Sequence, residues 1–477
     1  MGETVIIVGA GTAGCTAAAR LSEDADRQVI LLEAGPDGGH DPALQSVNWI
    51  DALGHRDAFY GDLYASKTVG GEPKLYQRGR GVGGSASTNA MLALPGLPLD
   101  YDNYAESYGL HRWSWDQVQP WFAQLKPTLT RSTDGEQTPV DRALLHSGAE
   151  LGLPDGVDAY TPDDGSALLY RTADRSGRKS SLELWLDPAR DRPNLQIRPD
   201  SQVDRLLIDG LRVRGVRLAD GAEIFGDQVI LCAGTFETPC ILLRSGLDLP
   251  GLGQGLQDHP AASIYFSMKP EFRDPDPAKP CIGAVMRLSS SVGEGDLHLL
   301  PLHGELLESS PPAHGLLMAA VMRTRSVGSL RLNPEQPLAP PIVEERMLDD
   351  EQDRIAMREA VAATARVLAG EAFQQIIETA FIDERGTPLA ALDDDEVYED
   401  WLARYVGDYF HAVGTARMGR DDDPLAVVDQ LGHVRGLEGV AVWDASILPE
   451  VPSANTQLPV AMLAERLSAA YRSGELV

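Results

Sequence analysis

Three glycines and one acid near the N-terminus have the types and spacing of a dinucleotide-binding site. Gly9, Gly11 and Gly14 form a GxGxxG turn, and Glu33 follows the turn by roughly 20 residues. The first glycine permits the tight turn, the second lets backbone approach a pyrophosphate, and the third lets the next helix pack closely. The helix N-terminus faces the phosphate charge, and the acid can hold a ribose hydroxyl. The pattern predicts a site for NAD or FAD; a βα turn without ligand is the alternative.

These residues need a strand, a turn, a helix and a second strand to position them. Val5–Val8 is rich in β-branched residues and predicts a buried parallel strand, and residues 16–21 continue as a helix of small residues. Val29–Leu32 predicts the second strand. Val229–Leu231 predicts a further buried strand, and its small-residue turn at 232–234 is expected to approach the same nucleotide from the other side.

A second glycine-rich segment, RGRGVGGSASTNAM, occupies residues 78–91. Small residues around Gly83-Gly84-Ser85 would let backbone amides lie against a flat or anionic ligand, and a flexible glycine loop is the alternative. Residues 37–76 have no sustained periodicity and predict a long ordered loop over a ligand. Residues 101–125 are amphipathic and aromatic, which predicts a helical cap.

Other candidate residues favour structural roles. His259 lies between Asp258 and Pro260 and fits a structural corner better than a catalytic or metal site. The histidines of residues 297–314 lack metal-ligand spacing, and no metal site is expected. The basic residues of 175–179 predict a solvated loop. Strand-like runs across 261–333 and an amphipathic helix at 351–369 predict a second domain built on an antiparallel sheet.

Composition limits the possible functions. The 477 residues are too many for one ordinary domain, and the net charge of −30 would repel nucleic acid and anionic membranes. No stretch approaches the roughly 18 apolar residues of a membrane span, and no secretory signal precedes the first strand. The four cysteines lack CxxC or zinc spacing, and Cys15 and Cys232 are expected to be buried thiols, so a cytoplasmic location is predicted. Hydrolase, phosphoryl-transfer and zinc-protease motifs are absent from the sequence.

Six blocks in order make the chain resemble the glucose–methanol–choline (GMC) family of flavin oxidoreductases along nearly its whole length. The blocks are VIIVGAGTAG with Glu33, RGRGVGGSASTNAM, YDNYAESYGLHRWSWDQVQPWFAQL, VILCAGTFETPCILLRSGL with LQDHP, HAVGTARMG, and VWDASILPEVPSANTQLPVAMLAE. The resemblance implies an α/β plus α+β fold, with a Rossmann-like FAD-binding domain and a separate substrate domain on an antiparallel sheet. It implies an FAD-binding domain at residues 1–98, 188–262 and 425–477, and a substrate-binding or cap domain at 99–187 and 263–424.

The resemblance also assigns roles to residues. His411 matches the family's catalytic base, which takes the hydroxyl proton of an alcohol, and Asn455 matches its partner, which can donate a hydrogen bond to the alkoxide. Flavin N5 accepts the hydride, and the product is an aldehyde or ketone. A buried structural His411 is the alternative. The residues expected to bind FAD are Gly9, Gly11, Thr12, Ala13, Gly14, Glu33, Ala34, Arg80, Gly83, Gly84, Ser85, Asn89, Ala90, Met91, Val203, Ala233, Gly234, Asp444, Ala445, Asn455, Thr456 and Gln457.

Departures from the family pattern leave some points open. Thr88 stands where members with covalent FAD have histidine, so non-covalent FAD is expected, while Ala416 and Gln457 replace a usual cysteine and asparagine. The electron acceptor is either dioxygen, as in an oxidase, or a quinone or other carrier, as in a dehydrogenase. Phe410 beside His411 slightly favours restricted access for dioxygen. A hydroxynitrile-lyase-like enzyme and a catalytically silent FAD protein are rival functions. The expected substrate is a small-molecule alcohol of unspecified identity, and an oligomer is possible.

Overall fold

The N-terminal block folds as a strand, a turn, a helix and a second strand. β1 (Thr4–Val8) leads into the turn, α1 (Thr12–Leu21) leaves it, and β2 (Gln28–Leu32) ends at Glu33. The predicted order is confirmed, and the helix begins earlier than predicted because turn residues already adopt helical geometry. The structure is a computed structural model that describes residues 2–154, 157–174, 176–274, 276, 279–305 and 309–475.

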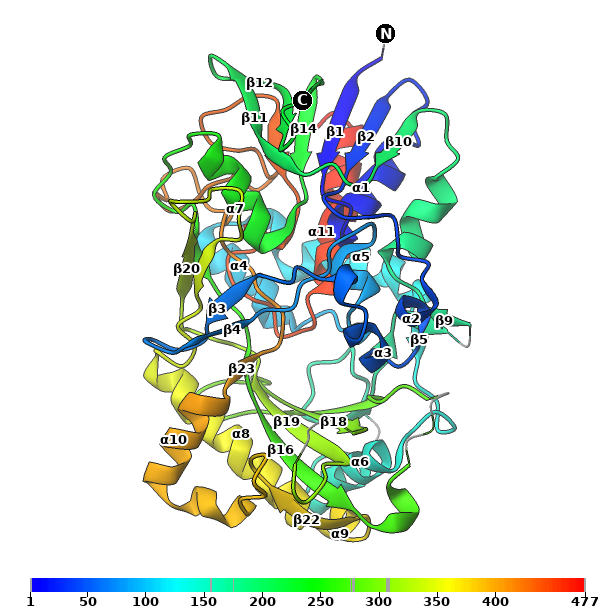
Figure 1. Ribbon diagram of the computed structural model, residues 1–477, viewed down its shortest axis with the longest axis vertical. Helices are drawn as coiled ribbons and strands as arrows, with labels where there is room; N and C mark the ends of the chain where they lie inside the picture. Colours follow the sequence, from blue (N-terminus) through cyan, green and yellow to red (C-terminus); the bar gives the residue numbers. More distant parts are fainter. Residues whose placement is uncertain are drawn as a thin grey trace.

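A five-stranded parallel sheet forms the upper unit of the molecule (Figure 1). Its order is β10-β2-β1-β14-β24, with β10 at Leu195–Arg198, β14 at Gln228–Leu231 and β24 at Val440–Val442. Every neighbouring pair is parallel, so the carboxyl ends of these strands share one edge of the sheet. The turns after β1, β2 and β14, each singled out in the sequence, therefore meet at that edge, where α/β sheets bind ligands.

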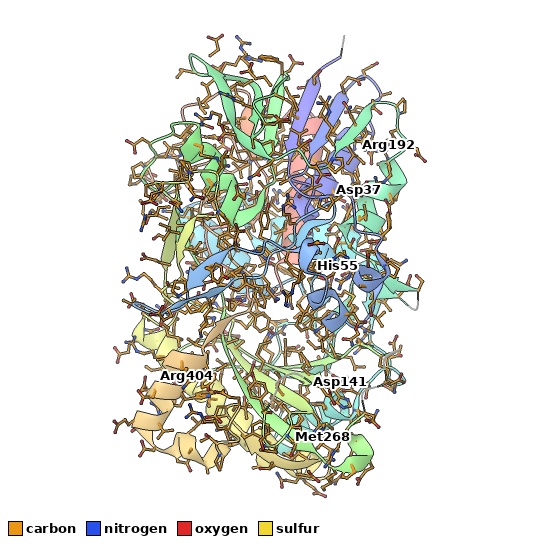
Figure 2. The ribbon with its side chains drawn as sticks, in the orientation of Figure 1. Asp37, His55, Asp141, Arg192, Met268 and Arg404 are labelled. Carbon is orange, nitrogen blue, oxygen red and sulfur yellow. The ribbon has the colours of Figure 1, made fainter. Side chains whose placement is uncertain are left out.

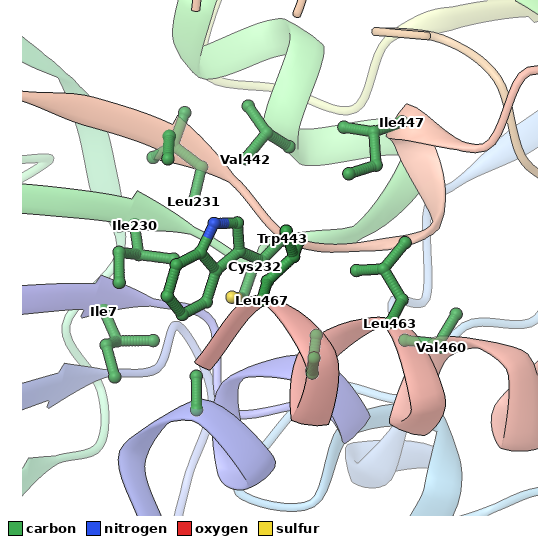
Figure 3. Packing of buried hydrophobic residues seen from close by; sticks show 14 of the residues in the cluster. Ile7, Ile230, Leu231, Cys232, Val442, Trp443, Ile447, Val460, Leu463 and Leu467 are labelled. Atoms are coloured by element: carbon green, nitrogen blue, oxygen red, sulfur yellow. The ribbon is translucent and has the colours of Figure 1, made fainter. Parts of the chain in front are cut away.

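The last helix of the chain packs on the first one, against the parallel sheet. α11 (Gln457–Arg472) lies beside α1, and both bury small and aliphatic side chains. Figure 3 shows the Trp443 ring between the sheet and α11. Cys15 and Cys232 are buried free thiols, as expected. The core of this contact includes Ile7, Ile230, Leu231, Cys232, Val442, Trp443, Ile447, Val460, Leu463 and Leu467.

Two smaller sheets complete the upper unit. The antiparallel ribbon β11-β12-β13 spans Val203–Asp209, Arg212–Leu218 and Glu223–Phe225, with a turn at Gly210 between its first two strands. α7 (Gly234–Arg244) follows β14. A mixed sheet has the order β15 (Gln254–Leu256), β20 (Gly328–Arg331), β21 (Ile342–Glu344), β3 (Tyr64–Ser66) and β4 (Pro73–Leu75).

The lower unit is an antiparallel sheet, which confirms the predicted second fold element. Its order is β22 (Ile377–Phe381), β16 (Pro260–Met268), β19 (Gly315–Val321), β18 (Leu297–His303), β17 (Ala284–Leu288) and β6 (Gly165–Leu168), and β23 (Gly407–Asp408) pairs with β16. Asp141 and Met268 mark this unit in Figure 2. The helices of this unit are α6 (Pro139–Glu150), α8 (Glu351–Ala369), α9 (Glu371–Gln374) and α10 (Asp395–Tyr405).

The aromatic segment at 101–125 is helical, but it packs differently from the prediction. α4 (Pro98–Tyr108) and α5 (Trp115–Leu125) share the buried cluster of the parallel sheet, and α5 contacts α11. We therefore propose that these helices belong with the nucleotide-binding unit rather than the cap; the other domain limits stay predictions. The predicted loop at 37–76 contains α2 (Pro42–Gln45), α3 (Ile50–Leu53), β3 and β4.

Short strands complete the described part of the chain, at Thr130–Arg131 (β5), Tyr170–Arg171 (β7), Ala173–Asp174 (β8) and Gly177–Arg178 (β9). Among the residues that the structure describes, we find no helix with the length and apolarity needed to cross a membrane.

Candidate functional site

A cavity of about 530 Å³ is lined by residues of both units. One wall is the carboxyl edge of the parallel sheet. The opposite wall is apolar and comes from the antiparallel sheet, through Tyr265, Leu300, Leu302, Leu316 and Met318. Side chains alternate along a strand, so β18 and β19 present one face to this cavity and the other to α8. The cavity has the size and the location of a small-molecule site.

The three glycines of the first turn divide their roles as the sequence predicts. A Cβ added at Gly9, whose φ is +97°, would lie 2.4 Å from the Cys232 carbonyl oxygen, and one at Gly14 would lie 1.8 Å from the Gly9 oxygen. Gly11 has no atom within 4 Å of such a Cβ. Gly9 and Gly14 thus serve close packing, whereas Gly11 leaves open the side of the turn that lines the cavity.

Two helices begin at this cavity without side-chain caps. Gly11 is the N-cap of α1 and Thr456 is the N-cap of α11, and neither helix start has a side-chain acceptor. The first N–H groups of a helix lack intrahelical partners, so each start offers donors and a partial positive charge. Gln457 adds an Nε2 that is buried and unpartnered among the described residues. This donor set fits a ligand that carries both a diphosphate and a ring with carbonyl groups, as FAD does.

Glu33 connects three segments at the wall of the cavity. One carboxylate oxygen accepts from the Ala10 N–H at 2.8 Å, and the other accepts from Gly35 at 2.9 Å and Gly81 at 3.1 Å. Burial raises the pKa of this carboxyl, and the three hydrogen bonds oppose the rise. Glu33 also lines the cavity, so it can both shape the wall and face the ligand.

Asp444 has a comparable role elsewhere in the cavity wall. Its Oδ2 accepts from the Gly234 N–H at 2.8 Å and the Thr238 hydroxyl at 2.6 Å, and its Oδ1 accepts from the Ser446 N–H at 2.9 Å. Burial raises the pKa of the Asp444 carboxyl. This carboxylate therefore joins α7 to the turn that leads toward Asn455.

Most of the residues expected to bind FAD line the cavity, and three do not. Gly14 packs on Gly9, Gly83 donates its N–H to the Ala10 carbonyl, and the Arg80 guanidinium donates to the Ala34 carbonyl at 2.8 Å. These three support the wall from behind instead of lining it. The predicted residues that line it are Gly9, Gly11, Thr12, Ala13, Glu33, Ala34, Gly84, Ser85, Asn89, Ala90, Met91, Val203, Ala233, Gly234, His411, Asp444, Ala445, Asn455, Thr456 and Gln457.

His411 and Asn455 meet in the same cavity. The Asn455 amide nitrogen lies 3.3 Å from His411 Nε2, and His411 Nδ1 lies 2.9 Å from Nδ1 of His259. Asp258 accepts the His411 backbone N–H at 2.9 Å. Burial lowers the pKa of His411 well below its ordinary value, and the neighbouring His259 and Arg78 lower it further. His411 is thus a neutral ring with one nitrogen directed to Asn455.

Sequence reasoning missed two residues behind this site. His259, expected at a structural corner, has its ring hydrogen-bonded to His411. Arg178, expected in a solvated loop, is 1% exposed and donates to the Asn89 side chain and the Ala86 carbonyl. Asn89 in turn donates to Gln457 at 2.8 Å. Arg175 of the same basic group lies outside the described residues. Nothing in the local pattern of either segment indicated these contacts.

Comparisons with known proteins agree with this geometry. Two sequence profiles, both described as GMC oxidoreductase, match residues 4–261 and 324–464. The 5-(hydroxymethyl)furfural oxidase of Methylovorus sp. (strain MP688) is 30% identical over 97% of each chain. Oxygen-dependent choline dehydrogenase 1 of Chromohalobacter salexigens is 31% identical, over 97% of this chain and 93% of that one. The crystal structure of pyridoxine 4-oxidase from Mesorbium loti superposes with a TM-score of 0.88 at 28% identity, over 99% of both chains. The chain therefore belongs to the GMC family and is an FAD-dependent alcohol oxidoreductase.

Proposed function

We propose that His411 takes the hydroxyl proton of an alcohol while the carbinol carbon loses a hydride, which gives an aldehyde or ketone. The observation that carries this proposal is the pair of His411 Nε2 and Asn455 Nδ2, 3.3 Å apart in the cavity. His411 Nδ1 is occupied by His259, so Nε2 is the nitrogen left to act as base. Anaerobic mixing with a panel of alcohols tests the proposal, because a flavin that no alcohol reduces would contradict it.

Different residues of the cavity have separate roles in this reaction. Bound FAD supplies the hydride acceptor. Gly11, Thr12 and Ala13 are placed for its diphosphate, Glu33 for its ribose, and the start of α11 for its ring. Asn455 donates a hydrogen bond to the oxygen as negative charge develops there. Thr88 lines the cavity in place of a histidine, which supports non-covalent binding of FAD.

The charges of the cavity favour an uncharged alcohol with an apolar or aromatic group. Each carboxylate in its described wall is already engaged: Glu33 by three N–H groups, Glu237 by Arg244, Asp408 by Lys67, and Asp444 by Gly234 and Thr238. The cation that lines the cavity close to His411 is Arg78, and the facing wall is apolar. The names of two relatives, a hydroxymethylfurfural oxidase and a pyridoxine oxidase, agree with this class.

Hydroxymethyl-furans and benzylic alcohols are therefore expected to reduce the flavin at least tenfold more efficiently than choline. Repulsion between Arg78 and a quaternary ammonium of about 1.4 kcal/mol is enough for that ratio. The measurement is the second-order rate constant of anaerobic flavin reduction for each alcohol. An Arg78→Gln variant should narrow the ratio if charge causes it. Choline reacting as fast as the aromatic alcohols would contradict this assignment of substrate class.

The lowered pKa of His411 predicts an unusual pH profile. A base works in its unprotonated form, so a depressed pKa keeps it active at lower pH. The rate of flavin reduction is therefore expected to stay on its plateau below pH 6.5, the ordinary value for histidine, and to fall only in more acidic buffer. Stopped-flow measurements from about pH 4.5 to 9 would give the pH at which the rate of flavin reduction falls to half of its plateau value. A midpoint above 6.5 is the result that would exclude a buried neutral base.

The acceptor of the electrons and the cellular location remain predictions. Dioxygen and a small carrier are the two candidate acceptors. Phe410, beside His411 in the chain, lines the cavity and is 36% exposed. Mixing the reduced enzyme with air-saturated buffer separates them, since an oxidase reoxidises at once and a dehydrogenase needs an added quinone.

A further inference from the structure

The ring of His259 makes the only side-chain hydrogen bond that the described residues offer to Nδ1 of His411. His259 precedes β16 and is fully buried, and its Nδ1 lies 2.9 Å from Nδ1 of His411. The two rings are perpendicular, with centroids 5.2 Å apart. A single carboxylate fixes both backbones, because Asp258 accepts the N–H of His259 at 2.7 Å and the N–H of His411 at 2.9 Å. Hydrogen bonds from both backbones to Asp258 therefore hold the two histidines of this contact in place.

Two imidazole nitrogens at this distance share one proton, so one ring donates and the other accepts. Burial keeps both rings neutral, since it lowers the pKa of His259 to about 3 and that of His411 well below its ordinary value. If His411 donates from Nδ1, its Nε2 keeps a free lone pair toward Asn455. If His259 donates instead, His411 carries its proton on Nε2 and has no base at the substrate.

We propose that His259 is the positioning residue that holds His411 in its Nδ1–H tautomer and so directs the basic nitrogen at the substrate. The inference rests on the proposed function of His411. When the alcohol O–H bond breaks, the proton forms a bond to Nε2 and leaves the His411 ring positive. The Nδ1–H donated to His259 then becomes a charge-assisted hydrogen bond, which stabilises that cation.

The other groups that face the pair do not replace His259. The ring centroid of Tyr409 lies 4.8 Å from that of His411 and 6.0 Å from that of His259. Arg78 and His298 lower the pKa of His411 through electrostatic interactions. Asp258 contacts both histidines through their backbone N–H groups. Among the described residues, no carboxylate hydrogen-bonds to either ring, so a neutral histidine holds the position that an acid holds beside many catalytic histidines.

Two variants of His259 with an amide side chain distinguish a positioning role of this residue from a packing role. Asparagine places its amide near the Nδ1 position of histidine, whereas glutamine places it near Nε2, out of reach of His411. His259→Asn is expected to keep flavin reduction within about tenfold of wild type, and His259→Gln to slow it by about 10- to 100-fold, as removal of an orienting partner does. His303→Asn, at a buried histidine of β18 whose ring contacts the Arg273 carbonyl and not His411, is the matched control. All three proteins should purify with FAD in wild-type ratio.

The tautomer can also be measured without turnover, by ¹⁵N NMR of the histidine-labelled holoenzyme; the chain has ten histidines. The His411 proton is expected on Nδ1, identified by the signal that disappears in His411→Asn. Finding it on Nε2 would overturn the inference, as would equal rates for the two His259 variants in a protein that alcohols reduce. A protein that no alcohol reduces, with its proton on Nδ1, would contradict the proposed function while the tautomer assignment stands.

Discussion

Replacing His411 by alanine is expected to slow flavin reduction by an alcohol at least about 10²-fold, the usual contribution of a general base. The alcohol would then have to give up its hydride while still protonated or pass its proton to water. His411→Asn, which keeps more of the volume, should show the same loss because an amide does not accept the proton. The measurement is the rate at which the oxidised flavin absorbance disappears on anaerobic mixing.

The His411 variants should still contain FAD, because the glycine turn and Glu33 lie elsewhere in the cavity wall. His146→Ala is a suitable control, since this histidine lies on α6, outside the cavity lining, and its ring hydrogen-bonds to the Arg142 carbonyl. A His411→Ala protein that is reduced as fast as wild type would disprove the role of the base. Loss of FAD from both His411→Ala and His411→Asn would instead show that His411 is needed for the shape of the site.

Replacing Glu33 by glutamine is expected to weaken FAD binding by about 10²-fold. Both carboxylate oxygens accept backbone N–H groups from Ala10, Gly35 and Gly81. Glutamine turns one oxygen into an NH₂ group, which faces at least one of these N–H donors. Buried hydrogen bonds to a charged group contribute about 1.5–3 kcal/mol each, so losing one or two corresponds to this change in affinity.

Reconstitution of the apoprotein with FAD, followed by flavin fluorescence, measures this affinity, and thermal unfolding of the apoprotein measures the loss of stability. Glu72→Gln is the matched control, because Glu72 is exposed between β3 and β4. A Glu33→Gln protein with wild-type affinity would mean that the three segments hold their places without the charge. In that case the carboxylate would matter little to the cofactor.

Residues that act through local geometry could be predicted from the sequence. Gly9 and Gly11 work within one turn, so their spacing already describes the site that they form. His259 and His411 are separated by 152 positions, and only the start of β16 brings them together. Arg178 reaches Asn89 across 89 positions in the same way. A local pattern tells which face of a segment is apolar, but not which partner covers it.

The same limit applies to the helices that the sequence assigns to a cap. The aromatic residues of α4 and α5 correctly indicated amphipathic helices, and amphipathicity does not identify the surface on which a helix packs. For α5 that surface is α11, more than 300 residues later in the chain, and α4 packs on α5. The strands of the lower unit were predicted more successfully, because each apolar run of strand length is visible on its own. The pairing of β6 with β17 and of β16 with β22 joins segments far apart in the chain and was not predicted.

The position of β24 and α11 has a consequence for synthesis of the protein. α1 (Thr12–Leu21) is synthesised long before α11 (Gln457–Arg472), the helix that covers it. As the ribosome extends the chain, the parallel sheet lacks its fifth strand and an apolar face of α1 stays uncovered until residues 440–472 emerge. The cofactor site is therefore completed only after residues 440–472 have emerged, and a nascent chain that ends before Asp444 should neither retain FAD nor resist proteolysis.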